Sequence, residues 1–107
     1  MTEDRYLKQF YRDVMPSITR IFSPAKVLVF GSRVRGTATE ASDIDVIIIA
    51  ESFRDIPFVN RMATVMKSVH FSKHVDYLCY TPEEYEQLKD RSSILKDAVS
   101  YAVEVAL

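Results

Sequence analysis

Three aspartates of this chain occupy positions from which they could bind a divalent cation together. Asp43 and Asp45 open an isoleucine-rich segment, and Asp76 lies near the start of another apolar run. Residues i and i+2 of a strand point to the same face, so Asp43 and Asp45 would converge, roughly 6 to 7 Å apart along the backbone. Carboxylates at the mouth of a core repel each other and lose solvation unless a cation or other donors compensate them. The alternative interpretation is solvated acids at strand ends.

A second candidate segment, Gly31-Ser32-Arg33-Val34-Arg35-Gly36, contains the only two glycines of the chain. Glycine lets a backbone turn sharply and approach a ligand closely. Ser32 offers a hydroxyl and an amide, and Arg33 and Arg35 offer charge, so the segment could hold a triphosphate. The glycine spacing fits neither the P-loop nor the dinucleotide fingerprint. A plain strand-to-helix turn is the alternative.

The hydrophobic pattern predicts the elements that must position these residues. Helical spacing is expected over Tyr6–Phe22 with a break before Pro16, from Pro57 to about His70, from Thr81 onwards, and over Ile94–Val105 with extended residues at its end. Short apolar runs predict strands over Lys26–Phe30, Asp43–Ala50 and Val75–Tyr80.

The predicted strands can bring the candidate residues together in one topology. If Ser32, after the first strand, and Asp43, at the start of the second, share a site, those strands are antiparallel neighbours. If the starts of the second and third strands also meet there, with Asp76 on the third, those two strands are parallel. The helix predicted from Pro57 supplies the crossover that a parallel pair needs. The sequence therefore predicts an α/β (α+β) fold in which a mixed sheet carries helices.

Composition limits the classes of function. With 107 residues, we expect a single domain spanning 1–107. A formal net charge of -1 gives no general attraction to a polyanion, so nonspecific nucleic-acid binding is disfavoured. Met1–Arg5 shows no signal pattern, and the longest apolar run, Val46–Ala50, is too short for a membrane span, so a cytoplasmic location is expected. Cys79 is expected in the core, and His74 is interpreted as a surface or hydrogen-bonded residue.

Taken together, Gly31-Ser32, ten further residues, Asp43-Ile44-Asp45, and Asp76 on the next strand closely resemble the nucleotidyltransferase superfamily related to DNA polymerase beta. The chain looks most like the stand-alone minimal nucleotidyltransferases (MNT proteins). The resemblance runs from about Lys26 to the helix that starts at Thr81. One departure is Val34, where an alanine is usual.

The resemblance implies the fold and the roles of the site residues. It implies an α-β-α-β-α-β core with a mixed sheet. It assigns Gly31, Ser32 and their backbone to the nucleotide phosphates, and Asp43 and Asp45 to two Mg²⁺ ions. Asp76 is assigned to the ion nearer the attacking hydroxyl. Such an ion pair acidifies the attacking oxygen and stabilises the leaving pyrophosphate. Which of Arg33 and Arg35 neutralises phosphate charge stays open.

The expected activity is transfer of AMP, or another nucleoside monophosphate, from ATP or another NTP to a hydroxyl. By resemblance, small MNT proteins often pair with a helical HEPN toxin, in some systems adenylylating its tyrosine and so acting as antitoxins. Competing interpretations are an inactive binding module that masks a partner, a small-molecule nucleotidyltransferase, and a drug-modifying or RNA-tailing enzyme, which normally needs another domain. Candidate docking residues are Tyr6, Phe10 and Tyr11 in the first helix and Ile94, Leu95, Ala98, Val99, Tyr101 and Val105 in the last.

Overall fold

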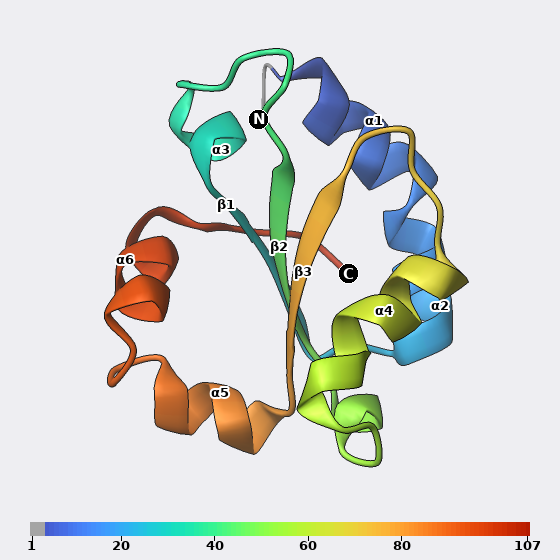
Figure 1. Cartoon of the computed structure of the whole chain (residues 1–107), viewed down its shortest axis with the longest axis vertical. Helices are drawn as coiled ribbons and strands as arrows, with labels where there is room; N and C mark the ends of the chain where they lie inside the picture. The colour runs from blue at the N-terminus through green and yellow to red at the C-terminus, as the bar shows by residue number, and fades with distance from the viewer. Residues whose placement is uncertain (1–3) are drawn as a thin grey trace.

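A mixed β-sheet forms the centre of the molecule in the computed structural model, which describes residues 4–107. Part of the Met1–Arg5 segment, on which the expectation of no signal sequence rests, lies outside the described residues. The sheet is four-stranded over residues 4–107, in the order β3-β2-β1-β4 (Figure 1). The strands are β1 Lys26–Phe30, β2 Ile44–Ile49, β3 Val75–Tyr80 and β4 Val103–Glu104. Strand β1 is antiparallel to β2, and β2 is parallel to β3, as the sequence predicts. Strand β1 is also antiparallel to β4.

The parallel pair is joined by the predicted crossover. Strand β2 is followed by a short 3₁₀ turn, η1 (Glu51–Phe53), and by helix α4 (Phe58–Ser68), which leads into β3. Helix α4 turns Arg61 and Val65 inward. The buried guanidinium of Arg61 bonds to the carbonyl oxygens of Ile56 and Cys79 and to the carboxylate of Glu84. Helix α4 is thereby tied to the end of β3.

The amino-terminal helical pattern is divided at the predicted break. Helix α1 (Arg5–Asp13) ends before helix α2 (Met15–Phe22) begins, and Pro16 occupies the first turn of α2. Proline is tolerated there because the first amides of a helix have no intrahelical acceptor. The Asp4 carboxylate caps α1 by accepting from the amides of Tyr6 and Leu7.

Helices cover both faces of the sheet (Figure 1). Helices α1, α2 and α4 pack on one face, and helices α5 (Pro82–Leu88) and α6 (Ser93–Tyr101) pack on the other. Strand β2 is buried between the two layers, because its alternate residues enter opposite cores. Ile44, Val46 and Ile48 belong to the first core, and Ile47 and Ile49 belong to the second.

The sequence did not predict helix α3 (Ser32–Arg35), and it predicted extended residues at the end of the last helix but not their pairing as a strand. Helix α3 is one turn that follows β1, and β4 pairs with β1 through Leu28↔Glu104 and Val29↔Val103. The final helix accordingly ends at Tyr101, and the chain continues extended along the sheet edge. Among the helices between residues 4 and 107, none combines the length and apolarity that crossing a membrane requires.

Candidate functional site

The sheet register brings the candidate residues to one end of three adjacent strands. Phe30, the last residue of β1, is paired with Asp45, and Asp45 is paired with Asp76. Gly31 and Ser32 directly follow Phe30, and Asp43 directly precedes β2. The segments that the sequence predicts to share a site therefore meet at one edge of the sheet.

Asp43, His74 and Asp76 form a group that could hold a cation. One ligand atom from each of these side chains lies within 4.8 Å of the others. The His74 Nε2 atom is 2.9 Å from Asp76 Oδ1. Asp43 and His74 are exposed and Asp76 is half-buried, so an ion could reach the group from solvent.

Asp45 lies deeper, between this group and the glycine segment. A Cβ atom built on Gly31 would come 2.1 Å from Asp45 Oδ2. Gly31 also has φ +85°, a conformation that residues with a side chain rarely adopt. Position 31 therefore needs glycine for two independent reasons, one of which is room for the Asp45 carboxylate.

The electrostatics of the group favour a cation. Burial, reinforced by the negative charges of Asp76 and Asp43, raises the pKa of the Asp45 carboxyl above its ordinary value. The hydrogen bond to Asp76 raises the pKa of the His74 imidazole, with further contributions from the Asp43 and Asp45 charges. A divalent ion would relieve the repulsion among these carboxylates, and carboxylate oxygens are the donors that Mg²⁺ prefers.

The glycine segment presents hydrogen-bond donors beside these carboxylates. Gly31 precedes α3, and its carbonyl accepts from the amides of Val34 and Arg35. Within residues 4–107, the Ser32 hydroxyl and the backbone amides of Ser32 and Arg33 have no hydrogen-bond partner. Adjacent free amides and a hydroxyl form a concave donor set that suits a phosphate.

The two arginines of the segment have different surroundings. The Arg33 side chain is buried, and its guanidinium bonds to the carbonyl oxygens of Thr39 and Ser42 and to the Asp4 carboxylate. The structure thus turns Arg33 toward the loop that precedes β2. Arg35 is half-exposed, 3.7 Å from an Asp97 carboxylate oxygen.

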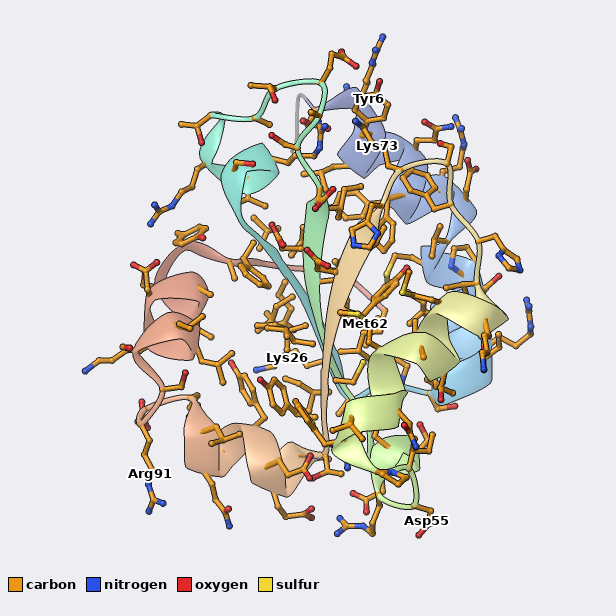
Figure 2. The ribbon with its side chains drawn as sticks, viewed as in Figure 1. Tyr6, Lys26, Asp55, Met62, Lys73 and Arg91 are labelled. Carbon is orange, nitrogen blue, oxygen red and sulfur yellow. The ribbon has the colours of Figure 1, made fainter. Side chains whose placement is uncertain are left out.

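The loop between α3 and β2 is fastened to neighbouring elements around Glu40. The Glu40 carboxylate accepts from Arg5 and from the Tyr6 hydroxyl, and its carbonyl accepts from Lys73. Lys73 Nζ lies 4.6 Å from the centre of the Tyr6 ring, and both side chains lie at the same end of the molecule (Figure 2). These contacts, with those of Arg33, hold the chain segment that delivers Asp43.

Two neighbours of the site were not assigned to it from the sequence. His74 is exposed and hydrogen-bonded as predicted, but it lies within the cation-binding group. The sequence spacing could have indicated this position, because residues i and i+2 of an extended segment, such as His74 and Asp76, lie on one face. Tyr101 accepts a hydrogen bond from the Gly31 amide at 3.2 Å across 70 residues of sequence, and no local pattern indicates that contact.

Comparisons with known proteins agree with this arrangement. A family model described as a nucleotidyltransferase domain matches residues 12–107. The structure is similar to that of a candidate nucleotidyltransferase from Sulfolobus solfataricus, with 28% identity, a TM-score of 0.60, and coverage of 80% of this chain and 76% of that chain. It is also similar to BolA1 from Arabidopsis thaliana, with a TM-score of 0.50 over 78% of this chain and 98% of that chain. At 15% identity this second likeness concerns the fold alone. No curated protein matches the chain.

Proposed function

The chain belongs to the nucleotidyltransferase domain family, and on that premise we propose that it transfers a nucleoside monophosphate from an NTP, ATP by preference, to an acceptor hydroxyl. The acceptor oxygen forms a bond to the α-phosphorus, the bond to the bridging oxygen breaks, pyrophosphate leaves, and the hydroxyl proton is released. The observation that carries this proposal is the contact of Asp45 with Gly31. Because of this contact, the Asp45 carboxylate lies next to the glycine segment, in which the Ser32 hydroxyl and the amides of Ser32 and Arg33 have no hydrogen-bond partner within residues 4–107.

Asp43, Asp45 and Asp76 fit the role of Mg²⁺ ligands. They offer oxygen donors on or next to adjacent strands. Burial, followed by the charges of Asp76 and Asp43, raises the pKa of the Asp45 carboxyl, and a bound ion would oppose both effects. When bound, two Mg²⁺ ions supply charge stabilisation for the leaving pyrophosphate and acidify the attacking hydroxyl. His74 lies on the exposed side of the group, where its ring nitrogen Nε2 is hydrogen-bonded to Asp76.

The glycine segment would orient the triphosphate. The Ser32 hydroxyl and the amides of Ser32 and Arg33 can donate to phosphate oxygens without first breaking a protein hydrogen bond. Arg35 adds positive charge from the exposed side of α3, whereas Arg33 holds the Asp43 loop in shape. Fixing the phosphates against the carboxylates aligns the α-phosphorus for in-line displacement.

We further propose that the acceptor hydroxyl belongs to a separate helical protein of the HEPN type, which the transfer would neutralise. This proposal is supported by the family resemblance and by apolar side chains left outside the core. Phe10, Leu95 and Ala98 are buried, so they are not available for docking. Ile94 is 73% exposed, and Tyr6 and Tyr11 are less than fully buried. Val99, Tyr101 and Val105 are also half-buried, so they remain docking candidates together with these three residues.

The experiment is a transfer assay with each of the four NTPs, Mg²⁺, and the helical protein that co-purifies from the native host. Intact-mass spectrometry of every chain should show one nucleotide-sized gain on the partner, with pyrophosphate released. The Asp43→Asn/Asp45→Asn variant should give neither signal. Asp55→Asn, an exposed carboxylate at the opposite end of the molecule from Lys73 (Figure 2), is the matched control and should behave like the wild type.

The assay also separates the competing functions. Pyrophosphate release without a protein mass gain would move the acceptor to small molecules. A stable complex without pyrophosphate release for any NTP would contradict the enzyme and favour a binding module that masks its partner.

A further inference from the structure

The last helix brings one hydroxyl group to the glycine segment. Tyr101, at the end of α6, accepts a hydrogen bond from the backbone amide of Gly31, with 3.2 Å between nitrogen and oxygen. Helix α6 packs against the same face of the sheet as α5, through Leu95. The hydroxyl is therefore delivered by a packed helix and lies one residue from the free Ser32 donors.

The Tyr101 hydroxyl has an unused donor. A phenolic hydroxyl has one proton to donate and lone pairs to accept with. Its oxygen accepts from Gly31, and over residues 4–107 its proton has no acceptor. Accepting a hydrogen bond polarises an O–H group and strengthens it as a donor. Tyr101 is half-buried, so a ligand at the glycine segment can reach this proton.

A positive charge is held against the same ring. The Arg35 guanidinium carbon lies 4.0 Å from the centre of the Tyr101 ring, and Arg35 is also paired with Asp97 of α6. A cation over an aromatic face is attracted by the ring quadrupole, which limits where the long Arg35 side chain rests. Helix α6 thus presents a donor beside Gly31 and positions the Arg35 cation of α3 next to that donor's ring.

We propose that Tyr101 is a polyphosphate-binding residue, whose hydroxyl donates to a phosphate oxygen of the NTP while it accepts from Gly31. The proposal rests on the proposed function and extends the nucleotide site beyond the glycine segment to α6. The chemistry recognised is the polyphosphate chain, so the contribution of Tyr101 does not depend on the base.

The test titrates magnesium tripolyphosphate, which has no base or ribose, into wild-type protein and two variants by calorimetry. Tyr101→Phe keeps the ring under Arg35 and removes the hydroxyl; affinity should fall about tenfold, the loss typical of one hydrogen bond to a charged group. Tyr85→Phe, on α5 and without a hydrogen bond to the glycine segment, is the control and should match the wild type. Thermal denaturation checks that each variant is folded.

A second measurement separates donation to the ligand from support of the loop. Monofluorotyrosine at position 101, below neutral pH where it stays protonated, has a more acidic hydroxyl that donates better and accepts worse. Tripolyphosphate binding should tighten severalfold if Tyr101 donates to phosphate; weaker binding would reduce Tyr101 to an acceptor for Gly31 and overturn the inference.

Wild-type affinity in folded Tyr101→Phe would also overturn the inference, while leaving nucleotidyl transfer intact. If the wild-type protein binds no tripolyphosphate and transfers no nucleotide, both the inference and the proposed function fail.

Discussion

At the scale of single residues, Asp45 is confined on two sides. Gly31 leaves room for its carboxylate on one side, and Asp76 faces it across the parallel pair β2–β3. Burial and the neighbouring negative charges raise the pKa of its carboxyl, and a bound cation would oppose this shift. The position of this carboxylate relative to the glycine segment is therefore set by backbone geometry.

Gly31→Ala tests that geometry against a matched glycine. Gly36 has φ +81°, close to the +85° of Gly31, but a Cβ there would meet nothing within 4 Å. Gly36→Ala should lose about 1 to 2 kcal/mol of unfolding free energy from backbone strain alone. Gly31→Ala should lose more, because the Gly31 ψ of -168° lies outside the left-handed helical region and because its methyl group collides with Asp45. It should also lose turnover. Urea denaturation of both variants measures the difference; equal losses would contradict the close contact.

Asp76→Asn separates chemistry from binding. By resemblance, Asp76 lies on the acceptor side of the site, so the variant should lose turnover while magnesium-nucleotide still binds. Calorimetry and the transfer assay, run on one preparation, give both quantities. Equal loss of binding and turnover would instead make Asp76 part of the general metal cage.

At the scale of elements, the loop between α3 and β2 is held by a buried guanidinium. Arg33 connects this loop to the first turn of α1 through Asp4, and the Arg33–Asp4 contact is 2.9 Å. Its guanidinium donates to the carbonyls of Thr39 and Ser42. The Thr39 oxygen also accepts from the Ser42 amide, whereas the Ser42 oxygen depends on the Arg33 side chain. Loss of Arg33 would therefore loosen the segment that leads into Asp43.

Arg33→Ala should lower the free energy of unfolding by about 3 kcal/mol, because it breaks a buried ion pair and leaves the Ser42 carbonyl without its donor. Arg12→Ala, which removes an exposed arginine paired with Asp13, should cost less than about 0.5 kcal/mol. Chemical denaturation checks both. If Arg33→Ala is as mild as Arg12→Ala but weakens nucleotide binding, Arg33 serves the phosphates and not the loop.

A second ion pair links α4 to α5 and makes stability depend on pH. The hydrogen bond from Arg61, followed by the Thr81 backbone amide, lowers the pKa of Glu84 below its ordinary value. The Glu84 carboxylate therefore adds stability above the ordinary carboxyl pKa, and this stability is lost as pH falls through the lowered pKa. Glu84→Gln should cost about 1 kcal/mol at neutral pH.

The pH dependence of that cost is the decisive feature. The difference between wild type and Glu84→Gln should shrink as the carboxyl becomes protonated in acid. Thermal denaturation across this range measures it, with Glu86→Gln, whose pair with Lys89 is exposed, as the control. A cost independent of pH would contradict an ionic contribution from Glu84.

At the scale of the whole molecule, the sequence predicts the sheet better than its edges. Strand β2 alternates between two cores, and its unbroken apolar run, Val46–Ala50, indicates burial on both faces. A shared site for the glycine segment and the aspartates then requires the end of β1 to meet the starts of β2 and β3. In contrast, β4 has two exposed residues, Val103 and Glu104, and its pairing depends on where β1 leaves an open edge.

In the candidate site too, residues indicated by local spacing could be predicted, whereas contacts that depend on distant segments could not. Local spacing indicates Gly31, Asp43, Asp45 and Asp76, which the sheet register brings to one edge. The direction of the Arg33 side chain depends on carbonyl groups of a loop that folds back over it, and the Tyr101 contact depends on the packing of α6. Neither depends on a pattern within its own segment, so sequence spacing could not predict them.

The measurement that tests the central claim most directly is calorimetric titration of each NTP, with Mg²⁺, into the wild type, Asp43→Asn/Asp45→Asn and the Asp55→Asn control. We expect magnesium-dependent binding of at least one NTP by the wild type and by Asp55→Asn. The double variant should lose this binding because the carboxylates beside Gly31 are neutralised. Unchanged magnesium-nucleotide affinity in a folded double variant would contradict a metal site at Asp43 and Asp45, because the ion and the triphosphate would then bind elsewhere.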